Sequence, residues 1–247
     1  MRRWFLLVLL AASACCGVDN KAIELDVDSI EADVSPGEPT INDTSRFVVV
    51  TDLVPEILVD LRYYGSDNFV GHPIDGYQQE VAILTREAAL ALKKVSDSLQ
   101  RCSLGLKIYD AYRPARAVRS FAEWAREPAD TSMKQHYYPR QSKGSLFANG
   151  YLSRRSNHCH GSTVDLTLVD LATGQELDMG TSFDLMDESS HYSYDKLSNI
   201  QSGNRRLLRQ IMVWGGFSPI ESEWWHFRLK NEPYTESFDF PVNRDSI

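Results

Sequence analysis

Apolar side chains recur at helical spacing in three segments of the chain. In residues 85–100 they share one face, and after Pro114 they form a second apolar stripe. Pro114 suits the first turn of a helix, where its missing N–H does no harm. The third segment, Asn204–Trp214, is followed by Gly215 and Gly216, and glycine is the usual residue just past a helix end. The pattern therefore predicts three helices.

Strands are predicted where Val, Ile and Leu cluster or alternate with polar residues. The segments are Arg46–Leu53, Ile57–Tyr63, Leu104–Ala111 and Thr163–Val169, with a final strand pair or extended segment over Phe217–Leu229. Residues 129–157 show no sustained period and are predicted to form a long irregular loop. Because helices and strands are mixed along the chain and the loops are long, we expect an α+β fold with a mainly antiparallel sheet and flanking helices.

The segment Thr163–Val169 alternates cleanly between apolar and polar residues. Its apolar residues should face the core, while Thr163, Asp165 and Thr167 should face a polar site on the other side of the sheet.

The amino terminus resembles an export signal. Arg2 and Arg3 precede a short apolar run and small residues that end at Ala14, directly before Cys15. The run is shorter than the about 20 apolar residues of a membrane-spanning helix. We expect residues 1–15 to be a signal in which Cys15 carries a lipid, residues 16–45 to be a flexible acidic tether, and residues 46–247 to form the domain. Cleavage after Ala14 without lipid, or a retained anchor, are the alternatives.

The 247-residue chain has a formal net charge of −8, which argues against nucleic acid as a partner. Export through this signal would place the domain outside the cytoplasm, at a membrane reached through the lipid anchor. An oxidising compartment would permit a disulfide between Cys102 and Cys159.

Two segments carry candidate metal ligands. His158 lies in a turn that Gly161 can shape, and Asp165 follows on the adjoining strand, so the two side chains can converge on one cation. His226, which follows Trp225, offers a third ligand. Three protein ligands leave a fourth position for water, as in catalytic zinc sites.

Two further residues could carry chemistry beside such a metal. Glu223 could take a proton from water, and Trp224 and Trp225 would keep the pocket dry. Arg113, where a strand ends and a helix begins, could stabilise negative charge on a carbonyl oxygen. Taken alone, a Trp-Trp-His run is more often the edge of an aromatic core, and an arginine before proline is more often an ion-paired strand end.

Together these segments resemble the VanX-type D-alanyl-D-alanine dipeptidases, zinc peptidases of the Hedgehog/DD-peptidase fold. The resemblance covers about residues 46–230, and its motifs are Ser156, His158, Gly161 and Asp165; Glu223, Trp224, Trp225 and His226; Tyr112, Arg113 and Pro114; and Met179, Gly180, Phe183 and Asp184. The sequence departs from the family at Thr163, where alanine is usual.

The resemblance implies one Zn²⁺ per chain, held by His158, Asp165 and His226, with Glu223 as the base and Arg113 facing the transition state. It also implies a small dipeptide substrate whose ammonium group pairs with Asp184 and which Ser156 helps to hold.

Two other functions stay open. One is a D,D- or L,D-carboxypeptidase or endopeptidase that trims cell-wall peptides with the same metal. The other is a non-catalytic zinc-bearing binding module, although such a module needs no base such as Glu223. His160 is expected at the surface or behind the ligands, and His191 at the surface or the rim of the pocket. Asp110 is expected to have a structural role, buried near Arg113 or capping a backbone turn.

Overall fold

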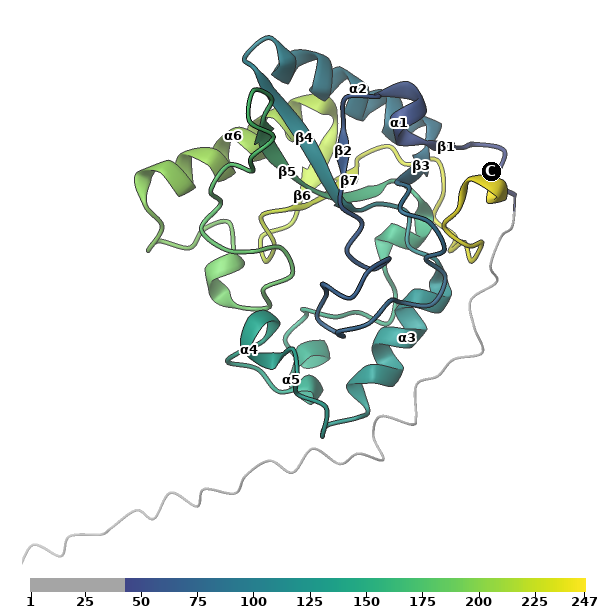
Figure 1. Ribbon diagram of the computed structural model, residues 1–247, viewed down its shortest axis with the longest axis vertical. Helices are drawn as coiled ribbons and strands as arrows, with labels where there is room; N and C mark the ends of the chain where they lie inside the picture. The colour runs from purple at the N-terminus through teal and green to yellow at the C-terminus, as the bar shows by residue number, and fades with distance from the viewer. Residues whose placement is uncertain (1–42) are drawn as a thin grey trace, which may run out of the picture. The chain divides into compact units, whose positions relative to one another are not determined.

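The computed structural model describes residues 43–247 (Figure 1). The strands are β1 (Phe47–Val49), β2 (Leu58–Val59), β3 (Ile83–Thr85), β4 (Leu104–Asp110), β5 (Thr163–Asp170), β6 (Phe217–Pro219) and β7 (His226–Leu229). The helices are α1 (Val50–Leu53), α2 (Arg86–Gln100), α3 (Ala115–Ala125), α4 (Lys134–Tyr137), α5 (Lys143–Ala148) and α6 (Asn199–Gly215), with short 3-10 helices η2 (Asn157–His160), η3 (Glu188–Ser190) and η4 (Arg244–Ser246).

The predicted signal, Cys15 and the predicted tether up to residue 42 lie outside the described residues. Among the helices formed by residues 43–247, none is both long enough and apolar enough to cross a membrane.

The central sheet has five strands in the order β2-β4-β5-β7-β6. The β2–β4 pair is parallel, and the other three pairs are antiparallel. A separate two-stranded antiparallel sheet joins β1 and β3. Helices α2 and α6 lie at the top of Figure 1, and α3, α4 and α5 lie at the bottom. This architecture confirms the prediction of an α+β fold with a mainly antiparallel sheet.

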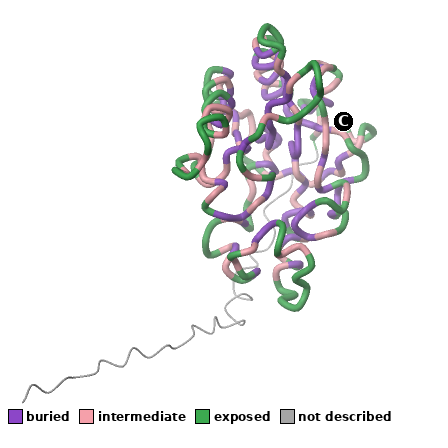
Figure 2. The backbone as a smooth tube through the Cα atoms, turned by 60° about the vertical axis from the view of Figure 1, so that its left-hand side comes forward, coloured by how far each residue is buried: buried purple, intermediate pink, exposed green. Residues whose placement is uncertain are grey.

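The two faces of β5 have different partners. Val164, Leu166 and Leu168 are fully buried in the core that the sheet forms with α2 and α6. Thr163, Asp165 and Thr167 alternate with them along the strand and therefore point to the opposite face. Figure 2 shows buried backbone running through the central strands and exposed backbone in the peripheral loops. The predicted alternation of this strand is confirmed.

A β-bulge in β4 places Asp110 on the same face as Asp165. Ile108 pairs with Leu166, but Asp110 pairs with Asp165, so the register shifts by one residue between them. In a regular strand Asp110 would point to the same side as Ile108, into the apolar core. The extra residue, Tyr109, turns the end of the strand so that Asp110 reaches the polar face.

An aromatic cluster packs against α3 and is separate from the core that contains α2 and α6. The ring of Phe121 lies 5.0 Å from that of Tyr63 and 4.8 Å from that of Phe69. These rings are almost fully buried. They form an apolar support next to the polar face of the sheet.

Two predicted strands are shorter in the structure. Arg46–Leu53 was predicted as one strand, but the pairing ends at Val49 and the chain turns into α1. The N–H of Val50 donates to Ala82 O and the N–H of Val54 donates to Val50 O, both at 2.9 Å. Ile57–Tyr63 pairs regularly only over β2. Beyond β2, contact with β4 continues through single hydrogen bonds because the Tyr109 bulge interrupts the ladder.

The other differences concern helices and cysteines. The predicted loop 129–157 contains α4 and α5 and ends where η2 begins, and α5 begins at a capping box formed by Ser142 and Ser145. Helix α6 begins at Asn199, five residues before the predicted start, because Ser198 caps it. The disulfide permitted by the sequence does not form: Cys102 and Cys159 are both free thiols.

Candidate metal centre

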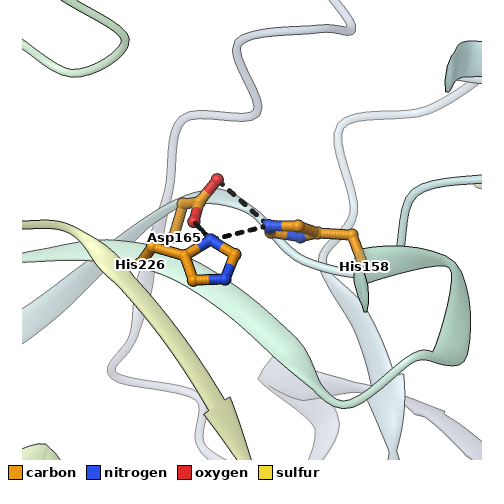
Figure 3. Close-up of side chains that lie close together, drawn as sticks. All are labelled: His158, Asp165 and His226. Carbon is orange, nitrogen blue, oxygen red and sulfur yellow. Dashed lines mark hydrogen bonds and ion pairs between the residues drawn. The ribbon is translucent and has the colours of Figure 1, made fainter. Parts of the chain in front are cut away.

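Three side chains from separate parts of the chain point toward one another on the polar face of the sheet (Figure 3). Nε2 of His158 lies 3.3 Å from Nδ1 of His226 and 3.3 Å from Oδ2 of Asp165. Nδ1 of His226 lies 3.0 Å from Oδ1 of Asp165. The side chains are only 2%, 3% and 12% exposed for His158, Asp165 and His226, respectively. The structure thus brings together all three predicted ligands.

The backbone around His158 fixes which of its nitrogens faces the centre. His158 belongs to η2, which Ser156 caps by accepting the His158 N–H, and which ends at Gly161 with φ of +81°. Nδ1 of His158 lies 2.7 Å from the carbonyl oxygen of Ala111. Because a carbonyl can only accept, Nδ1 carries the proton, and the lone pair of Nε2 points at the centre.

The sheet positions the other two ligands. Asp165 on β5 is the register partner of His226 on β7. Burial opposes ionisation of Asp165, but His158 and His226 outweigh it and hold the pKa of this carboxyl far below its usual range. Burial lowers the pKa of His226, yet the bond to Asp165 raises it overall. The carboxylate is therefore ionised in a buried site, as a metal ligand must be.

The donor set fits a zinc ion. Two imidazole nitrogens and one carboxylate oxygen are ligands that zinc prefers. Ligands at zinc bond lengths of about 2.0–2.1 Å in a tetrahedron are separated by about 3.3 Å from one another. The separations of 3.0–3.3 Å between His158, Asp165 and His226 match that geometry.

Glu223 lies beside the three ligands. Its Oε2 is 3.6 Å from Nδ1 of His226, and its side chain is 18% exposed. Burial raises the pKa of Glu223 to about 7, with nearby His226 acting in the opposite direction. Trp224 and Trp225 are buried next to it, as predicted. The carboxyl group can therefore exchange protons near neutral pH.

Arg113 is held next to the same centre by Asp110. The guanidinium donates to Oδ2 of Asp110 through Nε at 2.9 Å, and its Nη2 lies 2.8 Å from that oxygen. The same Nη2 is 3.7 Å from Oδ2 of Asp165. Burial raises the pKa of Asp110, and Arg113 and His158 oppose this. The predicted position of Asp110, buried beside Arg113, is confirmed.

Asp184 is buried close to the centre and bonded to a residue that the sequence did not single out. The hydroxyl of Tyr63 donates to Oδ2 of Asp184 at 2.7 Å. Burial raises the pKa of Asp184 well above its usual range, while the Tyr63 bond and Arg113 lower it. Asp165 and Glu223 also act on it electrostatically. A cationic group placed beside Asp184 would restore its negative charge.

The remaining candidates have other contacts. The hydroxyl of Ser156 accepts the backbone N–H of His158, so the structure shows it as a cap of η2. His160 lies 3.1 Å from Glu232, and His191 lies 3.5 Å from the hydroxyl of Tyr151. Neither histidine belongs to the ligand cluster found among the described residues.

Two residues of the site were missed at the level of sequence. Tyr63 lies in a segment predicted as an ordinary strand, and Tyr77, whose hydroxyl donates to Asp110 at 2.7 Å, lies in a loop. No local pattern marks either tyrosine. Thr163, the departure noted in the sequence, is fully buried, and its hydroxyl has no hydrogen-bond partner among the described residues.

Comparison with known proteins places these residues in a family. Residues 43–243 match the Peptidase_M15 family, described as D-ala-D-ala dipeptidase. The chain is 40% identical over 198 residues to a D-alanyl-D-alanine dipeptidase of Enterococcus faecalis, covering 80% of this chain and 98% of that protein. It is 40% identical over 200 residues to one of Streptomyces coelicolor, covering 81% and 99%, respectively. It is 36% identical over 189 residues to one of Escherichia coli, covering 76% and 87%.

Among solved structures, a mutant of the vancomycin-resistance D,D-pentapeptidase VanY in complex with Zn(II) aligns with a TM-score of 0.37 and 15% identity. The alignment covers 70% of this chain and 86% of that chain. This similarity is too low to inform the site. The family match spans most of the chain, and the sequence relatives are covered almost end to end. The chain therefore belongs to the D-ala-D-ala dipeptidase family, Peptidase_M15.

Proposed function

We propose that this protein is a zinc-dependent dipeptidase that hydrolyses D-alanyl-D-alanine or a closely related dipeptide. The observation that carries the proposal is the buried cluster of His158, Asp165 and His226 with Glu223 only 3.6 Å from His226. A ligand set beside a carboxyl group of raised pKa is the arrangement of a hydrolytic metal site. Membership of the family supplies the substrate class.

The metal and Glu223 have separate tasks. Zinc held by the three ligands would supply Lewis acidity, which makes a nearby water more acidic and polarises the scissile carbonyl. Glu223, in its ionised form, accepts a proton from the attacking water and returns a proton to the leaving amine. A carboxyl group whose pKa lies close to neutral can do both.

Arg113 faces the charge that develops on the carbonyl oxygen. Asp110 fixes the guanidinium through Nε and Nη2, and the same Nη2 lies 3.7 Å from Oδ2 of the ligand Asp165, so the cation is held beside the centre. Such a prearranged cation stabilises an oxyanion without reorganising during the reaction.

Asp184 binds the ammonium group of the substrate's first residue. Its side chain is buried, its pKa is raised, and its bond to Tyr63 limits its orientation. A carboxypeptidase or endopeptidase working on longer chains would have an amide at that place and no ammonium to pair. Asp184 therefore favours a dipeptidase over these alternatives.

The test is a hydrolysis screen with the zinc-loaded protein. The substrates are D,D-, L,D- and L,L-dipeptides together with longer peptides that end in D-alanyl-D-alanine. The expected result is rapid cleavage of D,D-dipeptides and little cleavage of the longer peptides. Equal cleavage of both would favour the carboxypeptidase. Zinc binding without turnover of any substrate would favour a binding module.

We also propose that the enzyme is exported and anchored to a membrane through lipid on Cys15. Support comes from the order of basic residues, apolar run and small residues before that cysteine. Lipoprotein anchors with more than one acyl chain hold stably. Mass spectrometry of the membrane fraction tests this, and a mature chain that starts at an unmodified Cys15 would contradict it.

A further inference from the structure

We propose that Arg205 is a positioning residue. It holds residues 179–191, and thereby Asp184, in the conformation that receives the substrate's ammonium group. The inference rests on the proposed function, because it assigns to Arg205 the support of the binding residue named there. Arg205 lies on α6 and is only 1% exposed.

The guanidinium contacts the segment on both sides of Asp184. Its Nε donates to Met179 O at 2.7 Å, before Asp184 in the chain. Its other nitrogens donate to Ser189 O at 2.9 Å and to His191 O at 2.8 Å, after Asp184. One rigid planar group thus fixes the two ends of the segment relative to each other.

The segment needs such external support because its backbone is strained at Asp184. Asp184 has φ of +60°, in the left-handed region that residues with a side chain seldom adopt. Conformations of this kind persist only where the surrounding structure holds them. The Tyr63 hydroxyl fixes the Asp184 side chain, and the Met186 N–H donates to Tyr137 O at 2.7 Å. The two ends of the segment are fixed from α6.

The same arginine connects this segment to the one that carries Glu223. Nη2 of Arg205 lies 3.3 Å from the Thr181 hydroxyl, which also accepts from Nε1 of Trp224 at 2.8 Å. The backbone N–H of Trp224 donates to Ser190 O at 3.2 Å. Because Trp224 directly follows Glu223, a displacement of the segment would alter the spacing between the ammonium site and the base.

The chemistry of Arg205 indicates a specific role rather than general stability. Burial lowers its pKa to about 10, so it is charged at neutral pH. Within residues 43–247 its hydrogen-bond partners are carbonyl and hydroxyl oxygens, and no carboxylate forms an ion pair with it. A well-packed apolar residue is often as stabilising as a buried charge. What an apolar residue cannot do is fix three carbonyls in one geometry.

The test compares Arg205→Met with wild type in two measurements. The first is kcat/KM for D-alanyl-D-alanine and for its N-acetylated form, with bound zinc determined in the same samples. A displacement on the order of 1 Å at such a site can cost about 10²-fold. We expect a loss of that size for the free dipeptide, mainly through KM, with little change for the acetylated one and with zinc retained. In a protein that already carries Asp184→Ala, adding Arg205→Met should lower kcat/KM for the free dipeptide only slightly further.

The second measurement is amide hydrogen exchange by mass spectrometry, which does not depend on turnover. Exchange over 179–191 should accelerate in Arg205→Met and stay unchanged in α2. Arg206→Met is the matched control, because Arg206 is exposed on the same helix, and it should behave as wild type. Thr181→Val, which removes the shared hydroxyl, should shift both measurements in the same direction by a smaller factor.

The outcomes separate the two proposals. If wild type does not cleave D-alanyl-D-alanine, the proposed function fails, and the exchange data still test the role of Arg205. If Arg205→Met keeps both the preference for the free amine and the slow exchange of 179–191, the positioning role is overturned and the dipeptidase stands. If Arg205→Met does not fold, Thr181→Val decides: an unchanged substrate preference and unchanged exchange overturn the role.

Discussion

Asp165 on β5 and His226 on β7 are direct register partners in the central sheet, and Oδ1 of Asp165 lies 3.0 Å from Nδ1 of His226. Their spacing is therefore set by the hydrogen-bonded ladder rather than by a loop. Sites built on strands hold their geometry more closely than sites built on loops. Only His158 reaches the centre from a turn. That turn is held by the Ser156 cap and by the hydrogen bond from Nδ1 of His158 to Ala111 O.

The first prediction separates metal ligands from the base. Asp165→Asn keeps the shape of the side chain but removes its charge, so bound zinc and turnover should fall together. Glu223→Gln should keep about one zinc and lose about 10²–10⁴-fold in turnover, because an amide cannot accept the proton. Elemental analysis and kinetics on the same samples provide the check. Loss of zinc from Glu223→Gln would make Glu223 a ligand instead.

The second prediction concerns pH. Glu223 must be ionised to accept a proton, and burial raises its pKa to about 7. Activity should therefore be present above this pKa and fall as the pH drops through it, and a bound cation can only move the midpoint lower. The profile of kcat/KM should show an acid limb at or below pH 7 that disappears in Glu223→Gln. An acid limb centred well above pH 7 would assign it to another group.

The third prediction concerns the ammonium site. Asp184→Asn keeps the size of the side chain and can still bond to Tyr63. A charge-assisted hydrogen bond contributes about 1.5–3 kcal/mol, so kcat/KM for D-alanyl-D-alanine should fall by about 10- to 160-fold. The N-acetylated dipeptide should be a poor substrate of both proteins. If wild type cleaves the acetylated and free forms equally well, Asp184 has another role.

The fourth prediction concerns the turn that carries His158. Gly161 has φ of +81°, and a Cβ there would lie 2.2 Å from Cε1 of Phe47. The Phe47 ring cannot move aside, because four aromatic rings surround it. Gly161→Ala should destabilise the fold by about 2–4 kcal/mol, from left-handed strain and overpacking together.

Gly174 is the matched control for that substitution. It has φ of +69°, but nothing lies within 4 Å of its would-be Cβ. Gly174→Ala should therefore cost only the conformational part, about 1 kcal/mol. Denaturant unfolding of both variants, with and without zinc, gives the comparison. Equal losses in the two variants would show that contact with Phe47 is not what constrains Gly161.

The fifth prediction concerns the two thiols of the domain. Cys102 is exposed, whereas Cys159 is buried, and burial raises the pKa of its thiol to about 12. Since the thiolate is the reactive form, iodoacetamide at pH 8 should modify Cys102 and spare Cys159. Peptide mapping identifies the modified site, and denatured protein should react at both. Rapid modification of Cys159 in folded protein would show that η2 opens readily.

The sequence predicted those elements in which the spacing of apolar residues matches the side chains that are buried. Helix α2 matches to within one residue, because its apolar face and the Thr85 cap are both local signals. The alternation in β5 likewise revealed which side of the strand carries Asp165. The helical turn at Val50–Leu53 could not be predicted, because its β-branched residues favour a strand and its Val50 N–H donates to Ala82 O, a partner distant in the sequence.

The metal ligands were predictable because they lie in short sequence motifs. The residues that hold the site in place from elsewhere in the chain were not predicted. Tyr63 reaches Asp184 across 121 positions of the chain, and no local pattern encodes that contact. Arg205, by contrast, has a signal in the sequence pattern. It occupies a buried position of α6 in line with Leu208 and Met212, where an apolar residue is expected. A charged residue at such a position indicates a specific partner.

The bulge in β4 has a consequence for protein design. It allows two consecutive residues to serve one face: the ring of Tyr109 stacks on Phe183 at 4.7 Å, beside Asp184, while Asp110 braces Arg113. An idealised strand offers that face only every second residue, and so could supply one of these functions but not both. Anyone who transplants this centre onto a regular scaffold must therefore transplant the irregularity with it.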